Sequence, residues 1–215
     1  MEPVDDECIY HAIGMFLRDE ILKVYNIDSC IATTFCGLEI LKRYNVPAKP
    51  IVIRHVIGNH EAFKLFYNGV IPPNATKEQI EEAYKKTNAH VIGMGFGNRT
   101  VTGGKPYEEG HVAIEVDQGI LDLTLDQASR DQYNMHFTPS LLEWNDGGKD
   151  AFIGGKTIQH FFDDGNKNPM FVRTSYAGDF HGFKQSPNWG LTTPNKKIID
   201  KSLSMISMFL AAGVN

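Results

Sequence analysis

Apolar residues near the start of the chain recur every three or four positions, which is the spacing of one face of an α-helix. This pattern covers residues 5–25 and returns over residues 30–44. Asp28 and Ser29 stand directly before the second run, where either side chain could cap the first turn of a helix. The chain is therefore predicted to open with two amphipathic helices.

Short runs of β-branched and alternating residues predict strands further along the chain. "NVPAKPIVIRHVI" reads as the end of a helix followed by a strand, and "PMFVRTSY" as another strand. "GHVAIEVDQGILDLTLDQ", residues 110–127, has two such runs separated by "DQG", which is typical of a β-hairpin. Between these strands, Thr76 stands three residues before Gln79 and predicts a capping box at the start of another helix.

The pattern is weaker after residue 130. "SLLEWND" is predicted as a short helix, residues 177–195 as an irregular loop rich in glycine and aromatic residues, and residues 196–210 as a final helix. Neither an internal repeat nor an interdomain linker stands out. The order of elements predicts one α+β domain over residues 1–215, with a less regular part from 131 to 215.

Composition narrows the classes of partner. The 215 residues are 42% hydrophobic and 22% charged, with a net charge of -5, so no basic field is present to attract nucleic acid or an anionic membrane. The most apolar C-terminal stretch, residues 198–214, is interrupted by Asp200 and Lys201 and is shorter than the roughly 20 residues that a membrane span needs. We expect neither nucleic acid nor a membrane as partner.

The chain has three cysteines, which is an odd number and too few for the disulfide framework of a small secreted domain. The N-terminal stretch is acidic and does not have the basic start and apolar core of a signal peptide. Both features predict a reducing, cytoplasmic location.

Cys30 stands where the second helix should begin. There, free backbone N–H groups and the positive end of the helix dipole favour the thiolate over the thiol. Cys36 lies six residues on, about 240° around the helix, so the two sulfurs should not converge on one site. Cys36 and Cys8 are predicted to be packing residues.

A base and an acid follow in the hairpin. His111 begins the first strand, and the second strand carries Asp122 and Asp126, either of which could orient the imidazole. If Gln118 and Gly119 form a two-residue loop, His111 lies opposite Asp126, while Asp122 lies about 13 Å further along the strand. A nucleophile, a base and an orienting acid would satisfy the requirements of covalent catalysis.

The order of "SC" opening a helix, "GH" opening the strand "HVAIEV", and then "LDLT" resembles the transglutaminase-like cysteine superfamily. In outline it is also similar to papain-like peptidases and arylamine N-acetyltransferases. The resemblance implies a nucleophile-bearing helix packed on an antiparallel sheet, with Cys30 as nucleophile, His111 as base and Asp122 as the acid. Simple hairpin register favours Asp126, but the D-x-T context of Asp122 is the more specific observation, so we predict Asp122 as the acid and keep Asp126 as the alternative.

Such a triad predicts cysteine-dependent amide or acyl chemistry through a thioester, without a cofactor. Water as acceptor would give a peptidase or amidase, and an amine would give an acyltransferase or crosslinking enzyme. The substrate would be a protein, a peptide or a small amide or thioester. The alternative is a non-catalytic binding or inhibitory protein that holds a ligand in the same cleft, because fold alone does not determine function.

Two other features are interpreted as structural and not as binding sites. His55 and His60 in "RHVIGNH" have no accompanying cluster with metal-ligand spacing, so no metal is predicted, and we expect them to border the cleft of Cys30. The glycine-rich "GMGFGN", residues 93–98, does not lead into a helix, which argues against a phosphate site. It is predicted to be a mobile loop beside the cleft.

Overall fold

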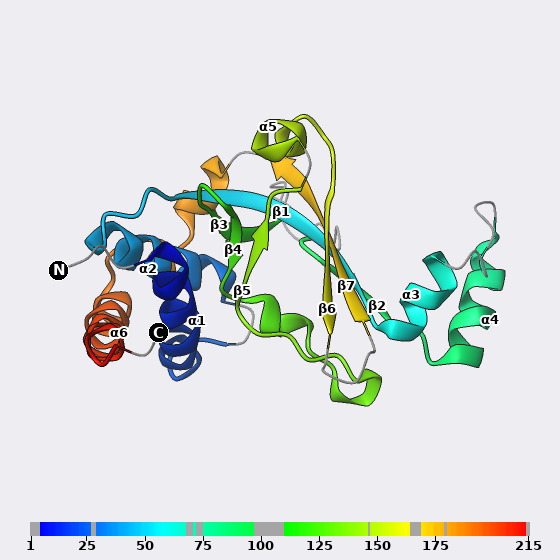
Figure 1. Ribbon diagram of the computed structural model, residues 1–215, viewed down its shortest axis with the longest axis horizontal. Helices are drawn as coiled ribbons and strands as arrows, with labels where there is room; N and C mark the ends of the chain where they lie inside the picture. Colours follow the sequence, from blue (N-terminus) through cyan, green and yellow to red (C-terminus); the bar gives the residue numbers. More distant parts are fainter. Residues whose placement is uncertain are drawn as a thin grey trace.

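The computed structural model describes residues 5–26, 29–67, 71, 75–96, 110–145, 147–163, 169–178 and 180–213. Three helices gather at one end of the molecule, an antiparallel sheet fills the middle, and two helices lie at the other end (Figure 1). The first group is α1 (Asp6–Leu22), α2 (Cys30–Arg43) and α6 (Thr193–Ala211), and the second is α3 (His60–Tyr67) and α4 (Lys77–Thr87).

The predicted helices form where local signals are strong. Asp5 caps α1 by accepting from the Glu7 N–H, and Thr76 and Gln79 form the predicted capping box of α4. Helix α6 begins three residues earlier than predicted because the Thr192 side chain caps it and a proline fits its first turn.

The strands are β1 (Lys49–Gly58), β2 (Val91–Met94), β3 (His111–Glu115), β4 (Gly119–Asp122), β5 (Ser140–Glu143), β6 (Ile158–Asp163) and β7 (Pro169–Gly178). Their order is β5-β4-β3-β1-β7-β6, every recorded pairing is antiparallel, and β2 pairs with β1. One edge of β1 pairs first with β3 and then with β2, while the other edge pairs with β7. The α+β class and the antiparallel sheet are thus confirmed, and β1 is the central strand.

The predicted hairpin is present, but its predicted register is wrong. Val116 and Gly119 exchange backbone hydrogen bonds, so the two-residue loop is Asp117 and Gln118. Glu115 pairs with Ile120, and continuing this register brings Asp122 opposite Ala113. Gly119 lies in the strand because β5 passes very close: a Cβ there would lie 2.2 Å from the backbone oxygen of Leu142.

The predicted helix at "SLLEWND" is also wrong, because this segment contains β5. All four residues of β5 pair with β4, and the Leu142 side chain is fully buried. Sheet pairing here overrides the local pattern. The part after residue 131, predicted to be less regular, contains among its described residues β5, β6 and β7 together with α5 (Gly148–Ile153) and α6.

The sheet is covered on both faces. Ile114 and Leu121 belong to a core shared with α1, α2 and α6, whereas Ala113 and Ile120 belong to a second core with β6 and β7. Neighbouring strand residues point to opposite faces, which explains this division. Among the residues that the structure describes, none of the helices combines the length and the apolar character that crossing a membrane requires.

Candidate active site

Cys30 is the first residue of α2 and is partly exposed. The predicted capping by Ser29 is wrong: Ser29 is the N-cap residue, but its side chain makes no capping hydrogen bond. Its Oγ instead accepts from Nη1 of the buried Arg18, at 3.0 Å. The Ser29 side chain therefore leaves the first-turn N–H groups of α2 free for other acceptors. Asp28, the other predicted cap, lies outside the described residues.

The start of β3 meets the start of α2. His111 and the Val112 N–H lie close enough to Cys30 that both lower the pKa of its thiol. Thr34, one turn further along α2, donates from Oγ1 to the Val112 backbone oxygen at 3.0 Å. These contacts hold the nucleophile-bearing helix against the strand that carries the histidine.

Asp122, at the end of β4, is the carboxylate that bonds His111. The Nε2 atom of His111 donates to Oδ2 of Asp122 at 2.9 Å. The other carboxylate oxygen, Oδ1, accepts from the Thr124 N–H at 2.9 Å and from the Thr124 hydroxyl at 3.0 Å. This D-x-T turn supports a carboxylate that is completely buried.

Asp126 lies elsewhere, in the short 3-10 helix η1 (Leu125–Ala128). Both of its carboxylate oxygens accept from Nε of Arg18, at 3.0 Å. Arg18 therefore links Asp126 to Ser29, the residue before Cys30. Asp126 therefore bonds Arg18 and not His111, which the corrected register explains.

A second histidine, His55, bonds the same oxygen of Asp122. Its Nε2 lies 3.0 Å from Oδ2, its Nδ1 lies 2.8 Å from the Thr174 hydroxyl, and its ring is fully buried. Sequence reasoning expected His55 only to border the cleft, together with His60. His60 instead begins α3, beyond the end of β1. The missed signal was a polar residue inside a buried β-branched strand, which needs a partner.

The pKa values of these groups favour a charged pair. Burial raises the pKa of the Cys30 thiol, but His111 and the Val112 N–H outweigh it, and the net pKa is lowered. Burial lowers the pKa of His111, but Asp122 and Cys30 outweigh it and raise the pKa to about 10. Burial also opposes ionisation of Asp122, yet the two histidines bring its pKa well below the usual range. The directions of these three shifts together favour the thiolate, the imidazolium and the carboxylate.

The hydrogen bonds also define the tautomer of His55. Burial lowers the pKa of His55 despite its bond to Asp122, so the ring is neutral. An ionised carboxylate only accepts, so Nε2 carries the proton, and Nδ1 accepts from the Thr174 hydroxyl. By the same reasoning, Nε2 of His111 donates to Asp122, which leaves its Nδ1 for Cys30.

His55, His111 and Asp122 place one ligand atom each within 4.8 Å of one another, so the three side chains could in principle hold a cation. Their nitrogens lie 2.9 and 3.0 Å from the carboxylate oxygen, which are hydrogen-bond lengths. A divalent metal would have to replace both shared protons in this buried site. The geometry therefore favours a proton network over a metal centre.

An aromatic segment forms an apolar wall beside the thiol. Phe180, Phe183 and Trp189 pack in one cluster with Cys30 and Val112. The rings of Phe180 and Trp189 are 4.3 Å apart between centroids. This wall excludes water from one side of the sulfur and strengthens nearby electrostatic interactions.

The glycine-rich segment is described only as far as Phe96, so the predicted mobility of residues 93–98 lies partly outside the described residues. Gly95 has a φ of +79°, and a Cβ there would lie 2.7 Å from the His111 backbone nitrogen. Glycine therefore lets this segment pass directly beside His111.

The other two cysteines differ from Cys30. Cys36 is fully buried within the helical core, and burial with a nearby Glu39 raises its pKa to about 12. This confirms the prediction that Cys36 is a packing residue. Cys8 is half-buried on α1.

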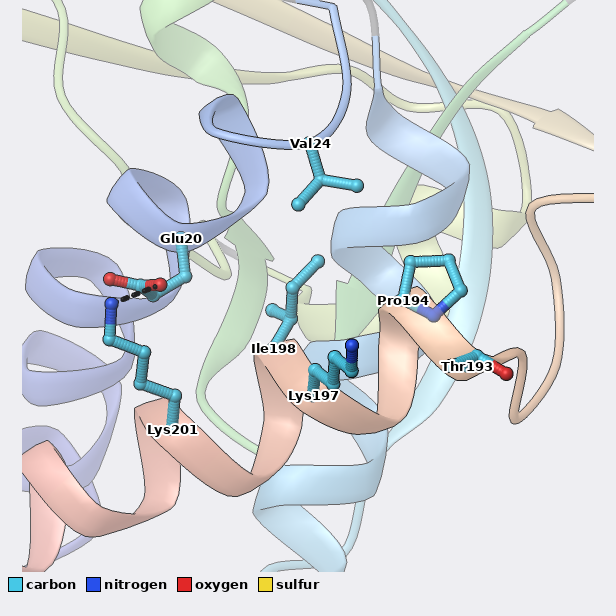
Figure 2. Close-up of a pocket in the computed structure, with 7 residues that line it drawn as sticks. All are labelled: Glu20, Val24, Thr193, Pro194, Lys197, Ile198 and Lys201. Carbon is cyan, nitrogen blue, oxygen red and sulfur yellow. Dashed lines mark ion pairs between the residues drawn. The ribbon is translucent and has the colours of Figure 1, made fainter.

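A separate pocket of about 350 Å³ lies between the end of α1 and the start of α6 (Figure 2). Glu20, which lines it, forms ion pairs with Lys23 and Lys201. Lys23 and Lys201 neutralise this buried carboxylate, so the charged groups of the pocket stabilise the fold. The pocket includes none of the residues around Cys30.

Compared with protein-family models, with curated proteins and with solved structures, the chain has no match in any of the three.

Proposed function

We propose that this protein is a cysteine-dependent enzyme that transfers or hydrolyses acyl groups at an amide or thioester carbonyl. The observation that carries the proposal is the meeting of Cys30, His111 and Asp122, in which His111 lowers the pKa of the Cys30 thiol and donates to Asp122 at 2.9 Å. Three separate elements, α2, β3 and β4, contribute these side chains. A nucleophile, a base and an orienting acid in contact form the arrangement that covalent catalysis requires.

The chemistry follows from the protonation states. The Cys30 thiolate would attack the carbonyl carbon, and the electron pair of the C=O bond would move to oxygen. Backbone N–H groups in the first turn of α2 would stabilise that oxyanion. The tetrahedral intermediate would then collapse, with His111 giving its proton to the leaving amine or thiolate, and a thioester would remain on Cys30. Asp122 would keep the imidazole oriented throughout.

The second half reverses these roles. His111, now neutral, would take a proton from an incoming water or amine as it attacks the thioester, and Cys30 would leave as a thiolate. Water would give a peptidase or amidase, and an amine would give an acyltransferase or crosslinking enzyme. The triad is equally suited to both acceptors. The apolar wall of Phe180 and Trp189 favours an acyl group with apolar surface near the carbonyl.

We extend the proposal to a transglutaminase-like or papain-like core. What supports it is a helix that begins with the nucleophile and packs on an antiparallel sheet carrying the histidine and the acid. A cytoplasmic location is proposed on chemical grounds, because the thiolate of a partly exposed cysteine is readily oxidised and the three cysteines are free.

Alkylation by iodoacetamide followed by peptide mapping tests the proposal, with Cys8 and Cys36 as internal references. At pH 7 an ordinary thiol of pKa about 8.5 is only roughly 3% ionised, so His111→Ala should slow labelling of Cys30 by about thirtyfold or more. If Cys30 reacts no faster than Cys8, and His111→Ala leaves its rate unchanged, the enzyme proposal is wrong. A non-catalytic binding protein would then be the better explanation.

A further inference from the structure

Resting on the proposed function of Cys30, we propose that His55 is a positioning residue that holds the Asp122 carboxylate in the orientation that serves His111. The unit around the thiol would then have four side chains, not three. Asp122 would be held by two histidines from neighbouring strands, His111 on β3 and His55 on β1.

The backbone of His55 is unusually well placed for this role. It lies inside β1, where it pairs with Met94 of β2 on one edge and Thr174 of β7 on the other. Its side chain is fully buried, and both ring nitrogens have a hydrogen-bond partner. The position of its Nε2 is therefore defined by the sheet and by the Thr174 hydroxyl.

Asp122 needs such a partner because its two carboxylate oxygens have different hydrogen-bond donors. The D-x-T turn holds Oδ1 through Thr124, and both histidines share Oδ2. During a catalytic cycle His111 loses and regains a proton, so its bond to Oδ2 changes in strength. The bond from His55 does not change, and it would keep Oδ2 aimed at His111 at every stage.

The surroundings explain why His55 would act as a constant donor. The titratable groups that face it are Asp122 from β4, His111 from β3 and the half-buried His160 from β6, with the neutral Thr174 on β7. Burial and the charge of His111 both oppose protonation of His55. Both effects lower the pKa of His55 and favour its neutral ring, which donates from Nε2 to Asp122.

Packing alone does not account for this histidine. Ile53 and Ile57, two residues before and after it on the same face of β1, belong to the second core, where burying an aliphatic side chain is more favourable than burying an imidazole. A merely structural His55 would affect stability and leave the titration of Cys30 unchanged. A positioning His55 would affect the titration itself, so the pH profile separates the two roles.

The test is the rate of Cys30 alkylation by iodoacetamide between pH 4 and pH 9, in the full chain. His55→Leu should shift the midpoint of the profile upward and slow labelling at pH 6 by about tenfold, since it removes a hydrogen bond to a charged group. His55→Gln keeps an N–H donor and should restore most of the rate. Thr174→Val should shift the midpoint in the same direction by less.

His90→Leu is the control, because His90 is a half-buried histidine that stacks on Tyr133, with ring centroids 3.7 Å apart, and not on the groups around Cys30. It should leave the profile unchanged, and thermal melts should establish that each variant folds. If His55→Leu does not fold, Thr174→Val is the variant that tests the positioning role, since it preserves volume and replaces only the hydroxyl with a methyl group.

Three results are distinguishable. Profiles of His55→Leu and Thr174→Val that coincide with wild type would overturn the positioning role while leaving the enzyme proposal intact. A wild-type Cys30 that is unreactive regardless of His111 would instead defeat the enzyme proposal. One equivalent of zinc in the purified protein, lost in His55→Leu, would replace the positioning role with a metal site.

Discussion

Cys30 and Cys36 belong to the same helix, less than two turns apart, and burial raises the pKa of both thiols. The pKa of Cys36 reaches about 12, whereas that of Cys30 is lowered overall. The difference is that the imidazolium of His111 and the Val112 N–H lower the pKa of Cys30, whereas Glu39 raises that of Cys36. Burial by itself makes a thiol inert, and a buried charge partner makes the same group reactive.

The largest loss of Cys30 reactivity should come from removing the charge of Asp122. Asp122→Asn removes the negative charge that holds His111 protonated, so labelling of Cys30 at pH 6 should fall by about tenfold or more. Asp126→Asn, the matched control four residues away, should change the rate by less than about twofold, because Asp126 pairs with Arg18. Equal losses in both variants would show that the choice of Asp122 is wrong.

The pH dependence of stability should show the charge on His111 that distinguishes Cys30 from Cys36. His111 has a folded pKa of about 10, above its ordinary value of about 6.5. Its contribution to stability is therefore fully present below pH 6.5 and is lost as pH rises toward 10. The difference in melting temperature between wild type and His111→Gln should shrink over this window, as measured by calorimetry. A difference that grows with pH would contradict the raised pKa.

The same linkage has the opposite sign for Asp122. Its pKa is lowered, so its contribution is present above about pH 4 and is lost only as pH falls further. The melting temperature of wild type should consequently drop more steeply below pH 4 than that of Asp122→Asn. Parallel curves for the two proteins in acid would argue that the carboxylate is not ionised in the native state.

The smallest effect on reactivity should come from Cys36. Cys36→Ala removes a buried sulfur from the helical core and should lower the free energy of unfolding by about 1–2 kcal/mol. Labelling of Cys30 should stay at the wild-type rate, since Cys36 belongs to the helical core and not to the cluster of described residues that packs with Cys30. A slower Cys30 in this variant would mean that core packing, and not only His111, determines the position of the α2 N-terminus.

Local patterns were enough to predict much of the fold. The helical periodicity of α1 and α2, the capping box of Thr76 and the hairpin around "DQG" all depend on residues close in sequence. The failures are non-local. The segment "SLLEWND" forms β5 because β4 provides hydrogen-bond partners, and Gly119 serves the close approach of β5 and not the turn. Neither contact leaves a signal in a short window of sequence.

The same division applies to the site. The sequence by itself determined that Cys30 begins a helix, that His111 begins a strand and that two aspartates follow, because helix starts and alternation are local properties. Only the tertiary structure decided that Asp122 bonds His111, that Asp126 pairs with Arg18 and that His55 completes the network. The physical reason is that hydrogen-bond partners are chosen by strand register and by which elements pack together, and these depend on contacts across the whole chain.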